Sequence, residues 1–132
     1  MIALYILIGL AILSVLVVTL RIGRREKISP QVKKKLLKMW EEVDKHDNDN
    51  QRVLEAEKVV EMLFREMDIQ GSFATKLKTM EAFIPDKEKV WAAHKLRNQI
   101  AHEPGFTVTR SDAKHATKAF RKIILNCIKI TL

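Results

Sequence analysis

The residues best suited to chemistry lie in one short stretch, Trp91–Phe106, with the sequence WAAHKLRNQIAHEPGF. Arg97 and His102 are five positions apart, so on a regular helix their side chains point about 140° away from each other. Asn98 comes one helical turn before His102, and His94 comes one turn before Asn98. These last three side chains therefore share a face of the helix.

An arginine and a histidine placed together predict a phosphate site. Arginine forms bidentate hydrogen bonds to phosphate oxygens and stabilises the negative charge that develops during their reaction. Histidine exchanges a proton near neutral pH, as general acid–base catalysis at an RNA 2′-hydroxyl or a leaving oxygen requires. The Pro104–Gly105 pair ends the helix, and we expect the bend there to let His102 approach Arg97. Such a site needs no metal, and we expect no cofactor.

This pattern resembles the R-x4-6-H signature of HEPN (higher eukaryotes and prokaryotes nucleotide-binding) domains. The resemblance covers about residues 29–132. It implies a metal-independent endoribonuclease whose site is formed at a homodimer interface. Arg97 would then hold the scissile phosphate, His102 would act as acid or base, Asn98 would orient the site and His94 would line it. Other members of that superfamily bind nucleotides or serve as assembly modules, so RNA and a nucleotide are both expected partners.

A structural role for the same residues stays open. Arg97 and His102 could hydrogen-bond the last carbonyls of their helix, where a cation is favoured by the helix dipole. Asn98 could hold the Glu103–Phe106 turn by bonding its backbone. The domain would then be a non-catalytic module that docks a protein partner at the membrane, or a basic face that binds anionic lipid.

The rest of the domain is expected to be all-α, a four- to five-helix up-and-down bundle. Apolar residues recur at helical spacing, with few Gly, Pro or aromatic residues to favour strands or disorder. Along the second helix we expect the acidic residues Glu57 and Glu61 to lie on the solvated face beside Lys58. The first helix of the bundle is expected to begin at Ser29–Pro30. The others are expected over 51–67, 73–83, 86–102 and the segment after Thr109. We expect Trp40, Trp91 and Cys127 to lie in the core.

Residues 1–20 predict a single transmembrane helix, because they contain no charged side chain and can span about 30 Å. Residues 21–28 are expected to be a basic linker, which can touch anionic lipid headgroups, and residues 29–132 the helical domain. A cleaved signal peptide would need a basic start and a small-residue cleavage site, which residues 1–20 lack. A buried core helix would need a polar face, which they lack as well. The positive-inside rule places the C-terminal domain in the cytoplasm, since the basic residues flank only the C-terminal end of the helix: Arg21, Arg24, Arg25 and Lys27.

The overall composition favours partners that carry phosphate. The 132 residues include 24 Lys and Arg against 16 Asp and Glu, a formal net charge of +8. A basic chain attracts RNA, DNA or an anionic lipid surface, and charge alone does not separate these ligands. The lone cysteine excludes an internal disulfide, which fits a reducing compartment.

Overall fold

The computed structural model describes the backbone of residues 1–23 and 28–130 and the side chains of 1–20 and 28–129. Every regular element in this part of the chain is helical, which confirms the all-α fold. Most of the expected linker, residues 24–27, lies outside the described residues. The elements are α1 (Ile2–Gly23), α2 (Pro30–Lys45), α3 (Asp49–Glu66), α4 (Phe73–Met80), the 3-10 turn η1 (Glu81–Phe83), α5 (Lys87–His102) and α6 (Arg110–Ile130).

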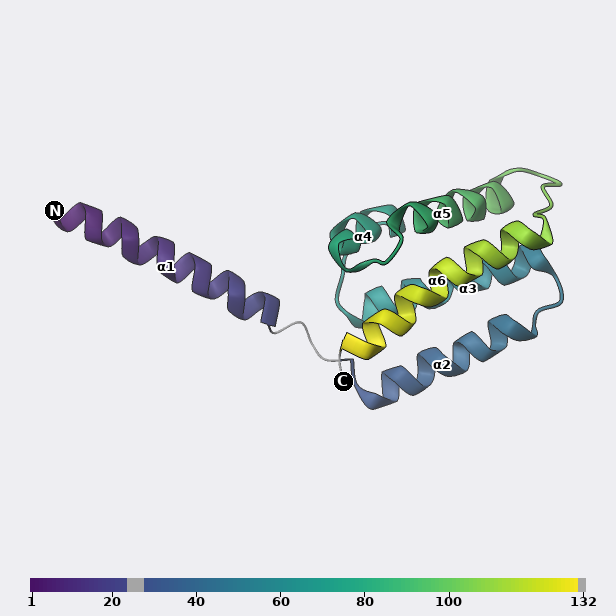
Figure 1. Ribbon diagram of the computed structural model, residues 1–132, viewed down its shortest axis with the longest axis horizontal. Helices are drawn as coiled ribbons and strands as arrows, with labels where there is room; N and C mark the ends of the chain where they lie inside the picture. Colours follow the sequence, from purple (N-terminus) through teal and green to yellow (C-terminus); the bar gives the residue numbers. More distant parts are fainter. Residues whose placement is uncertain (24–27, 131–132) are drawn as a thin grey trace.

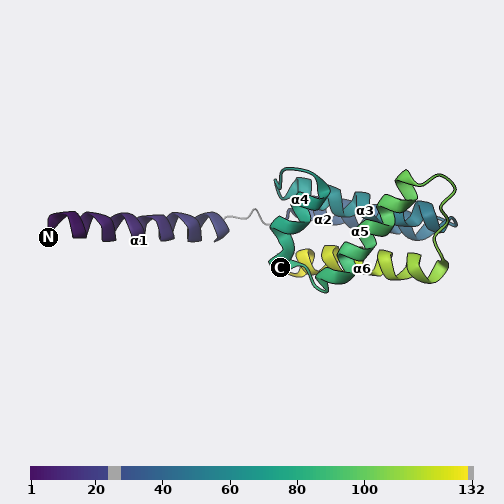
Figure 2. The same ribbon diagram turned by 90° about the horizontal axis from the view of Figure 1, so that it is seen from above.

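Helix α1 stands apart from the other helices (Figures 1 and 2). All the side chains of residues 1–20 are exposed, although nearly all of them are apolar. The core helix of a soluble protein would be buried, so that interpretation is excluded. The helix is long and apolar enough to cross a membrane, a property that signal sequences share.

Side-chain caps explain where most of the bundle helices begin. The Ser29 hydroxyl accepts a hydrogen bond from the Val32 N–H at 3.3 Å, and Pro30 occupies the first helical position, as expected. The Thr109 hydroxyl accepts from the Asp112 N–H at 3.1 Å and starts α6. Such bonds satisfy backbone donors that have no partner within the helix.

Two expected boundaries differ from the structure. Helix α3 begins at Asp49 rather than 51, because the Asn48 side chain accepts from the Gln51 N–H at 3.0 Å and caps the helix earlier. The expected helix over 73–83 is α-helical only to Met80 and tightens into η1, two residues before Pro85. Pro85 disfavours α-helical backbone at the residue before it, and Ile84 is extended, so η1 ends at Phe83.

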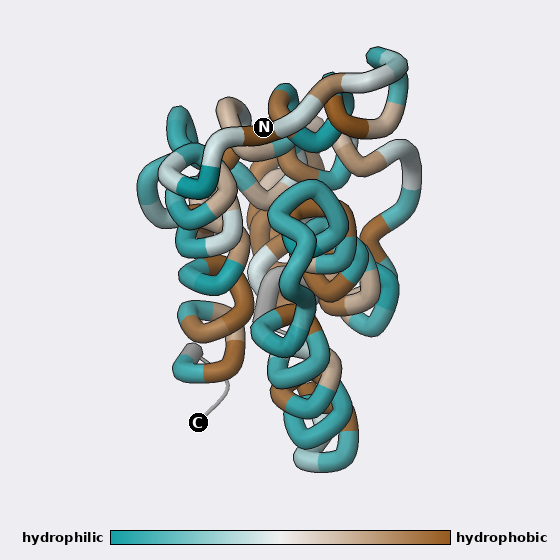
Figure 3. Tube along the Cα trace, turned by 90° about the vertical axis from the view of Figure 1, so that its right-hand side faces the viewer, coloured by the Kyte–Doolittle hydropathy of each residue, from teal (hydrophilic) through white to brown (hydrophobic). Residues whose placement is uncertain are grey.

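Helix α3 is the centre of the bundle and packs against α2, α5 and α6, while α5 also packs along α6. Hydrophobic positions recur along the bundle helices between hydrophilic ones, as the colouring in Figure 3 shows. Trp40 and Cys127 are buried as expected, and Trp91 is partly buried against the core. The largest fully buried side chains are Phe64, Phe120, Leu36, Leu63, Leu77, Met80, Ile123 and Ile124.

Candidate functional site around Arg97

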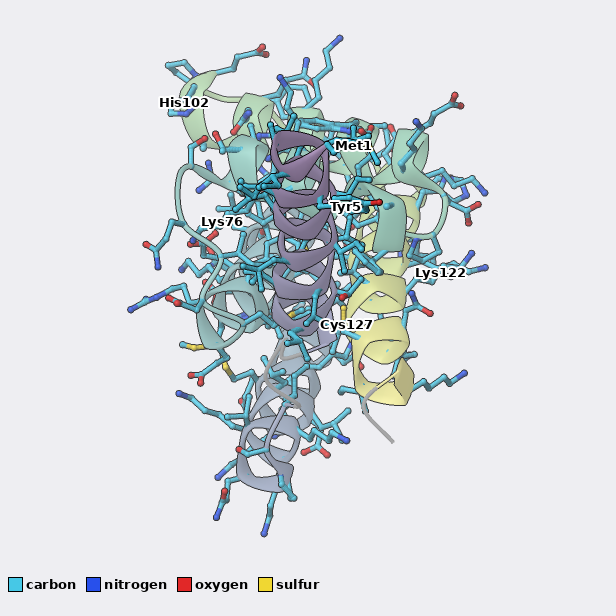
Figure 4. The ribbon with its side chains drawn as sticks, turned by 90° about the vertical axis from the view of Figure 1, so that its left-hand side faces the viewer. Met1, Tyr5, Lys76, His102, Lys122 and Cys127 are labelled. Carbon is cyan, nitrogen blue, oxygen red and sulfur yellow. The ribbon has the colours of Figure 1, made fainter. Side chains whose placement is uncertain are left out.

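Helix α5 carries all four predicted site residues and is fixed by packing on both sides. Its buried residues Val90 and Ala93 face the core, between α3 and α6. The helix stays regular to its end, where the Glu103 N–H donates to the Gln99 carbonyl at 2.9 Å. The expected bend ahead of His102 therefore does not occur. His102 is exposed at the outer edge of the bundle, at the end of α5 (Figure 4).

Arg97 points across to α3 and forms an ion pair with Glu57. Its Nε lies 3.1 Å from Glu57 Oε1, although the N–H is not aligned for a hydrogen bond to this oxygen. Its Nη1 donates to Asn98 Oδ1 at 3.3 Å. The Arg97 side chain is 31% exposed and that of Glu57 8%. The carboxylate thus holds the guanidinium from beneath while part of the cation still meets solvent.

His94 joins the same cluster from the preceding turn of α5. Its Nδ1 lies 2.8 Å from Glu57 Oε2, and its Nε2 lies 3.3 Å from Asn98 Nδ2. The ring also stacks at a tilt on Phe73, with the centroids 5.0 Å apart. The structure therefore brings His94, Arg97 and Asn98 together around one buried carboxylate, and His102 lies exposed one turn further along α5, outside this cluster.

Glu57 is the site residue that the sequence interpretation placed wrongly. We expected it on a solvated face, but it is buried at 6% exposure because α5 lays two basic side chains over it. A signal was present in the sequence. Glu57 follows Val53 by four positions and precedes Val60 by three, which places it in the apolar stripe of α3.

A second ion pair lies beside this cluster. Glu61, one turn after Glu57, pairs with Lys76 of α4, a lysine that is itself only 5% exposed. Glu61 was also expected to be solvated, and its side chain is 35% exposed while it pairs with this lysine. Figure 4 shows Lys76 on the flank of the bundle.

A cavity of about 310 Å³ opens between α3, α4 and α5 next to these pairs. Its lining mixes both signs of charge, with Lys58 and Arg97 beside Glu57 and Glu61. Within the described residues no three His, Cys, Asp or Glu side chains are grouped to hold a metal ion. The cavity is lined by Leu54, Glu57, Lys58, Glu61, Gly71, Ser72, Phe73, His94 and Arg97.

The loop after α5 is held by a residue from a distant part of the chain. Asn50 donates from Nδ2 to the Phe106 carbonyl at 2.7 Å and accepts at Oδ1 from the Val108 N–H at 2.9 Å. In the structural alternative Asn98 would hold this loop, but Asn98 bonds Arg97 and His94 instead. The capping role proposed for Arg97 is likewise replaced by an ion pair between two helices.

Comparison with known proteins adds no further assignment. No protein-family model, no curated protein and no solved structure matches this chain. The resemblance to HEPN domains therefore rests on the sequence pattern alone and remains a prediction.

Proposed function

We propose that this protein is a membrane-anchored, HEPN-like RNA-binding domain that cuts RNA without a metal ion, as a homodimer. The observation that carries the proposal is the setting of Arg97. Its guanidinium is oriented by a buried carboxylate and an amide, is still partly exposed, and lies on the same helix as an exposed histidine. An oriented arginine is the group that binds two phosphate oxygens at once.

The helix geometry makes a second copy of the chain part of the proposal. Because α5 is regular through His102, Arg97 and His102 of one chain diverge by about 140° and cannot both reach one phosphate. In a twofold dimer, Arg97 of one chain can meet His102 of its partner, and symmetry gives two such composite sites. A shared membrane raises the effective concentration of the two chains and favours this pairing.

The proposed reaction uses only groups of the RNA and of the two chains. The 2′-hydroxyl attacks the adjacent phosphorus, and the bond from phosphorus to the 5′-oxygen breaks. His102 takes the proton that leaves the 2′-oxygen, and the protonated ring then delivers it to the 5′-oxygen, so the imidazole ends neutral. Arg97 binds the non-bridging oxygens. The products are a 2′,3′-cyclic phosphate and a 5′-hydroxyl.

In the same proposal α1 spans a membrane and the bundle lies in the cytoplasm, where RNA is found. The support is the uncharged run of residues 1–20 and the basic residues that follow it. A reporter protein fused after Leu132 tests the orientation. A fusion that is active only outside the cytoplasm would contradict it.

The test of function is cleavage of labelled single-stranded RNA by the full-length protein in EDTA. We expect His102→Ala to lower the rate by about 10²–10⁴-fold. Arg97→Lys keeps the charge opposite Glu57 but loses the bidentate geometry, so we expect a loss of about 10²-fold or more without unfolding. His46→Ala, at the histidine that follows α2, is the matched control and should keep the full rate.

Mixing the two inactive variants tests the composite site. In a mixed dimer, one site combines both mutations and the other combines intact Arg97 with intact His102. Random pairing should therefore restore about a quarter of the wild-type rate. If the mixture stays inactive while the two variants demonstrably exchange subunits, the composite site is wrong.

A second candidate is a non-catalytic interaction module. The Glu57–Arg97 ion pair favours it, because a role in holding α3 to α5 is sufficient reason for an arginine at this position. This candidate predicts that no wild-type preparation cuts RNA, and that Arg97→Ala lowers the thermal stability.

A further inference from the structure

The net positive charge of the whole chain is located on two adjacent helices. Helices α5 and α6 together carry ten Lys and Arg against one Glu and one Asp, a formal +8. This equals the net charge of the full sequence, so basic and acidic residues cancel over the remainder. Apart from Arg97, which pairs with Glu57 on the α3 side, these basic residues attract an approaching polyanion to α5 and α6.

A groove runs between these two helices where they face solvent. It has a volume of about 680 Å³. The ribbon in Figure 2 shows that α5 runs obliquely across α6. Four small side chains form its floor, so a ligand can come close to both helix backbones: Ala92, Ala93, Ala116 and Ala119. Four lysines form its rims: Lys89, Lys95, Lys118 and Lys122.

The acidic residues of the groove do not cancel this charge. Asp86 accepts a hydrogen bond from Lys122 at 2.9 Å and has Lys89 nearby as well. Asp112 is the other acidic residue of the lining. Four lysines against two aspartates leave a formal +2 within the groove, and Lys122 projects outward from α6 (Figure 4).

The basic surface continues along the whole of α6. The helix has 21 residues, or about 30 Å, which is close to one turn of a nucleic acid duplex. Exposed basic side chains occur on almost every turn: Arg110, Lys114, Lys118, Arg121 and Lys129. Aromatic rings, on which the bases of single strands stack, are missing from the described lining of the groove.

We propose that the α5–α6 groove binds the phosphate backbone of a base-paired RNA stem, independently of its sequence. This inference rests on the proposed function and names the part of the substrate that lies outside the cleavage site. Gln99 lines the groove and precedes His102 by three residues, so the two are neighbours on the surface of α5. A stem held in the groove thus places the unpaired nucleotides that adjoin it next to His102.

The experiment measures binding by the full-length protein in nanodiscs over a series of salt concentrations. The probe is an RNA hairpin with a stem of about one helical turn, methylated at the 2′-oxygens of its unpaired nucleotides so that it cannot be cut. The groove variant is Lys89→Gln/Lys95→Gln/Lys118→Gln. The matched control, Lys34→Gln/Lys38→Gln/Lys78→Gln, removes the same charge from exposed positions on α2 and α4.

We expect the groove variant to bind about 10²-fold more weakly at 0.1 M salt. Its slope of log affinity against log salt should be shallower by about 2 to 3, since each lost phosphate contact removes about 0.7–0.9. The control should change affinity by less than about threefold, because charges beyond the Debye length are screened.

The outcomes separate this inference from the proposed function. Equal losses in the groove variant and the control, or tighter binding of a single strand than of the hairpin, would overturn the stem-binding groove while leaving RNA as the substrate. If no RNA binds and an acidic amphipathic peptide does so through Lys89, Lys95 and Lys118, both proposals are overturned.

Discussion

Replacing Glu57 tests whether the cluster on α5 is organised by one buried carboxylate. In Glu57→Ala, both Arg97 and His94 lose the anion that they contact at 3.1 and 2.8 Å. Breaking a fully buried ion pair costs about 3–5 kcal/mol. Since the Arg97 side chain is 31% exposed and water can replace part of the lost interaction, we expect about 2–3 kcal/mol here. For a domain of this size, the midpoint of thermal unfolding falls by roughly 10–20 °C.

Glu57→Gln removes the negative charge but keeps an oxygen that can accept a hydrogen bond, so it separates the contributions of the two to stability. The amide oxygen can still contact His94, so we expect a smaller loss, about 1–2 kcal/mol. Both variants are measured by urea and thermal unfolding of the full-length protein, followed by circular dichroism. Glu55→Ala is the matched control, because Glu55 lies on the same helix, forms an ion pair with the exposed Lys58 at 2.7 Å and accepts a hydrogen bond from Gln51 at 2.8 Å. An exposed pair of this kind contributes about 0.2–1 kcal/mol.

A double-mutant cycle gives the decisive comparison. The coupling energy between Glu57 and Arg97 should exceed that between Glu55 and Lys58 by about 1 kcal/mol or more. If the two coupling energies are equal, or if Glu57→Ala is as mild as Glu55→Ala, then burial of the carboxylate does not strengthen this ion pair and our reasoning is refuted.

Three further predictions follow from single contacts. Asn50→Ala should cost about 1–3 kcal/mol and speed proteolysis of the loop around Phe106, because two backbone groups lose their partner; unchanged cleavage would contradict this role. Burial raises the pKa of the Cys127 thiol to about 11, so a thiol reagent should react slowly until urea unfolds the chain. Its folded-state pKa lies above that of the unfolded chain, so stability should also fall as pH rises toward 11. The hydrogen bond from Lys122 lowers the pKa of Asp86, so its contribution is present at neutral pH and lost in acid. Asp86→Asn should therefore lower the urea midpoint at neutral pH and leave it unchanged in strong acid.

Much of the fold follows from local patterns in the chain. The uncharged run before Arg21 predicts the long apolar helix, and Ser29–Pro30 and Thr109 mark helix starts that the structure confirms. These features depend on residues within one or two turns of each other, so the sequence displays them directly. The start of α3 differs by two residues, because the Asn48 cap decides it, and α4 ends at Met80, where the chain continues as η1.

For the candidate site, the sequence shows which residue types are present, whereas the structure decides what they contact. The residue types and the spacing of Arg97, Asn98 and His102 are visible in the sequence and carry the resemblance to HEPN domains. Whether the helix bends before His102, and what Arg97 contacts, depends on packing between helices that are far apart along the chain. Glu57 lies 40 positions before Arg97. Only the packing of α5 on α3 buries this carboxylate against two basic groups, because the cost of desolvating it is offset only when those partners arrive with it.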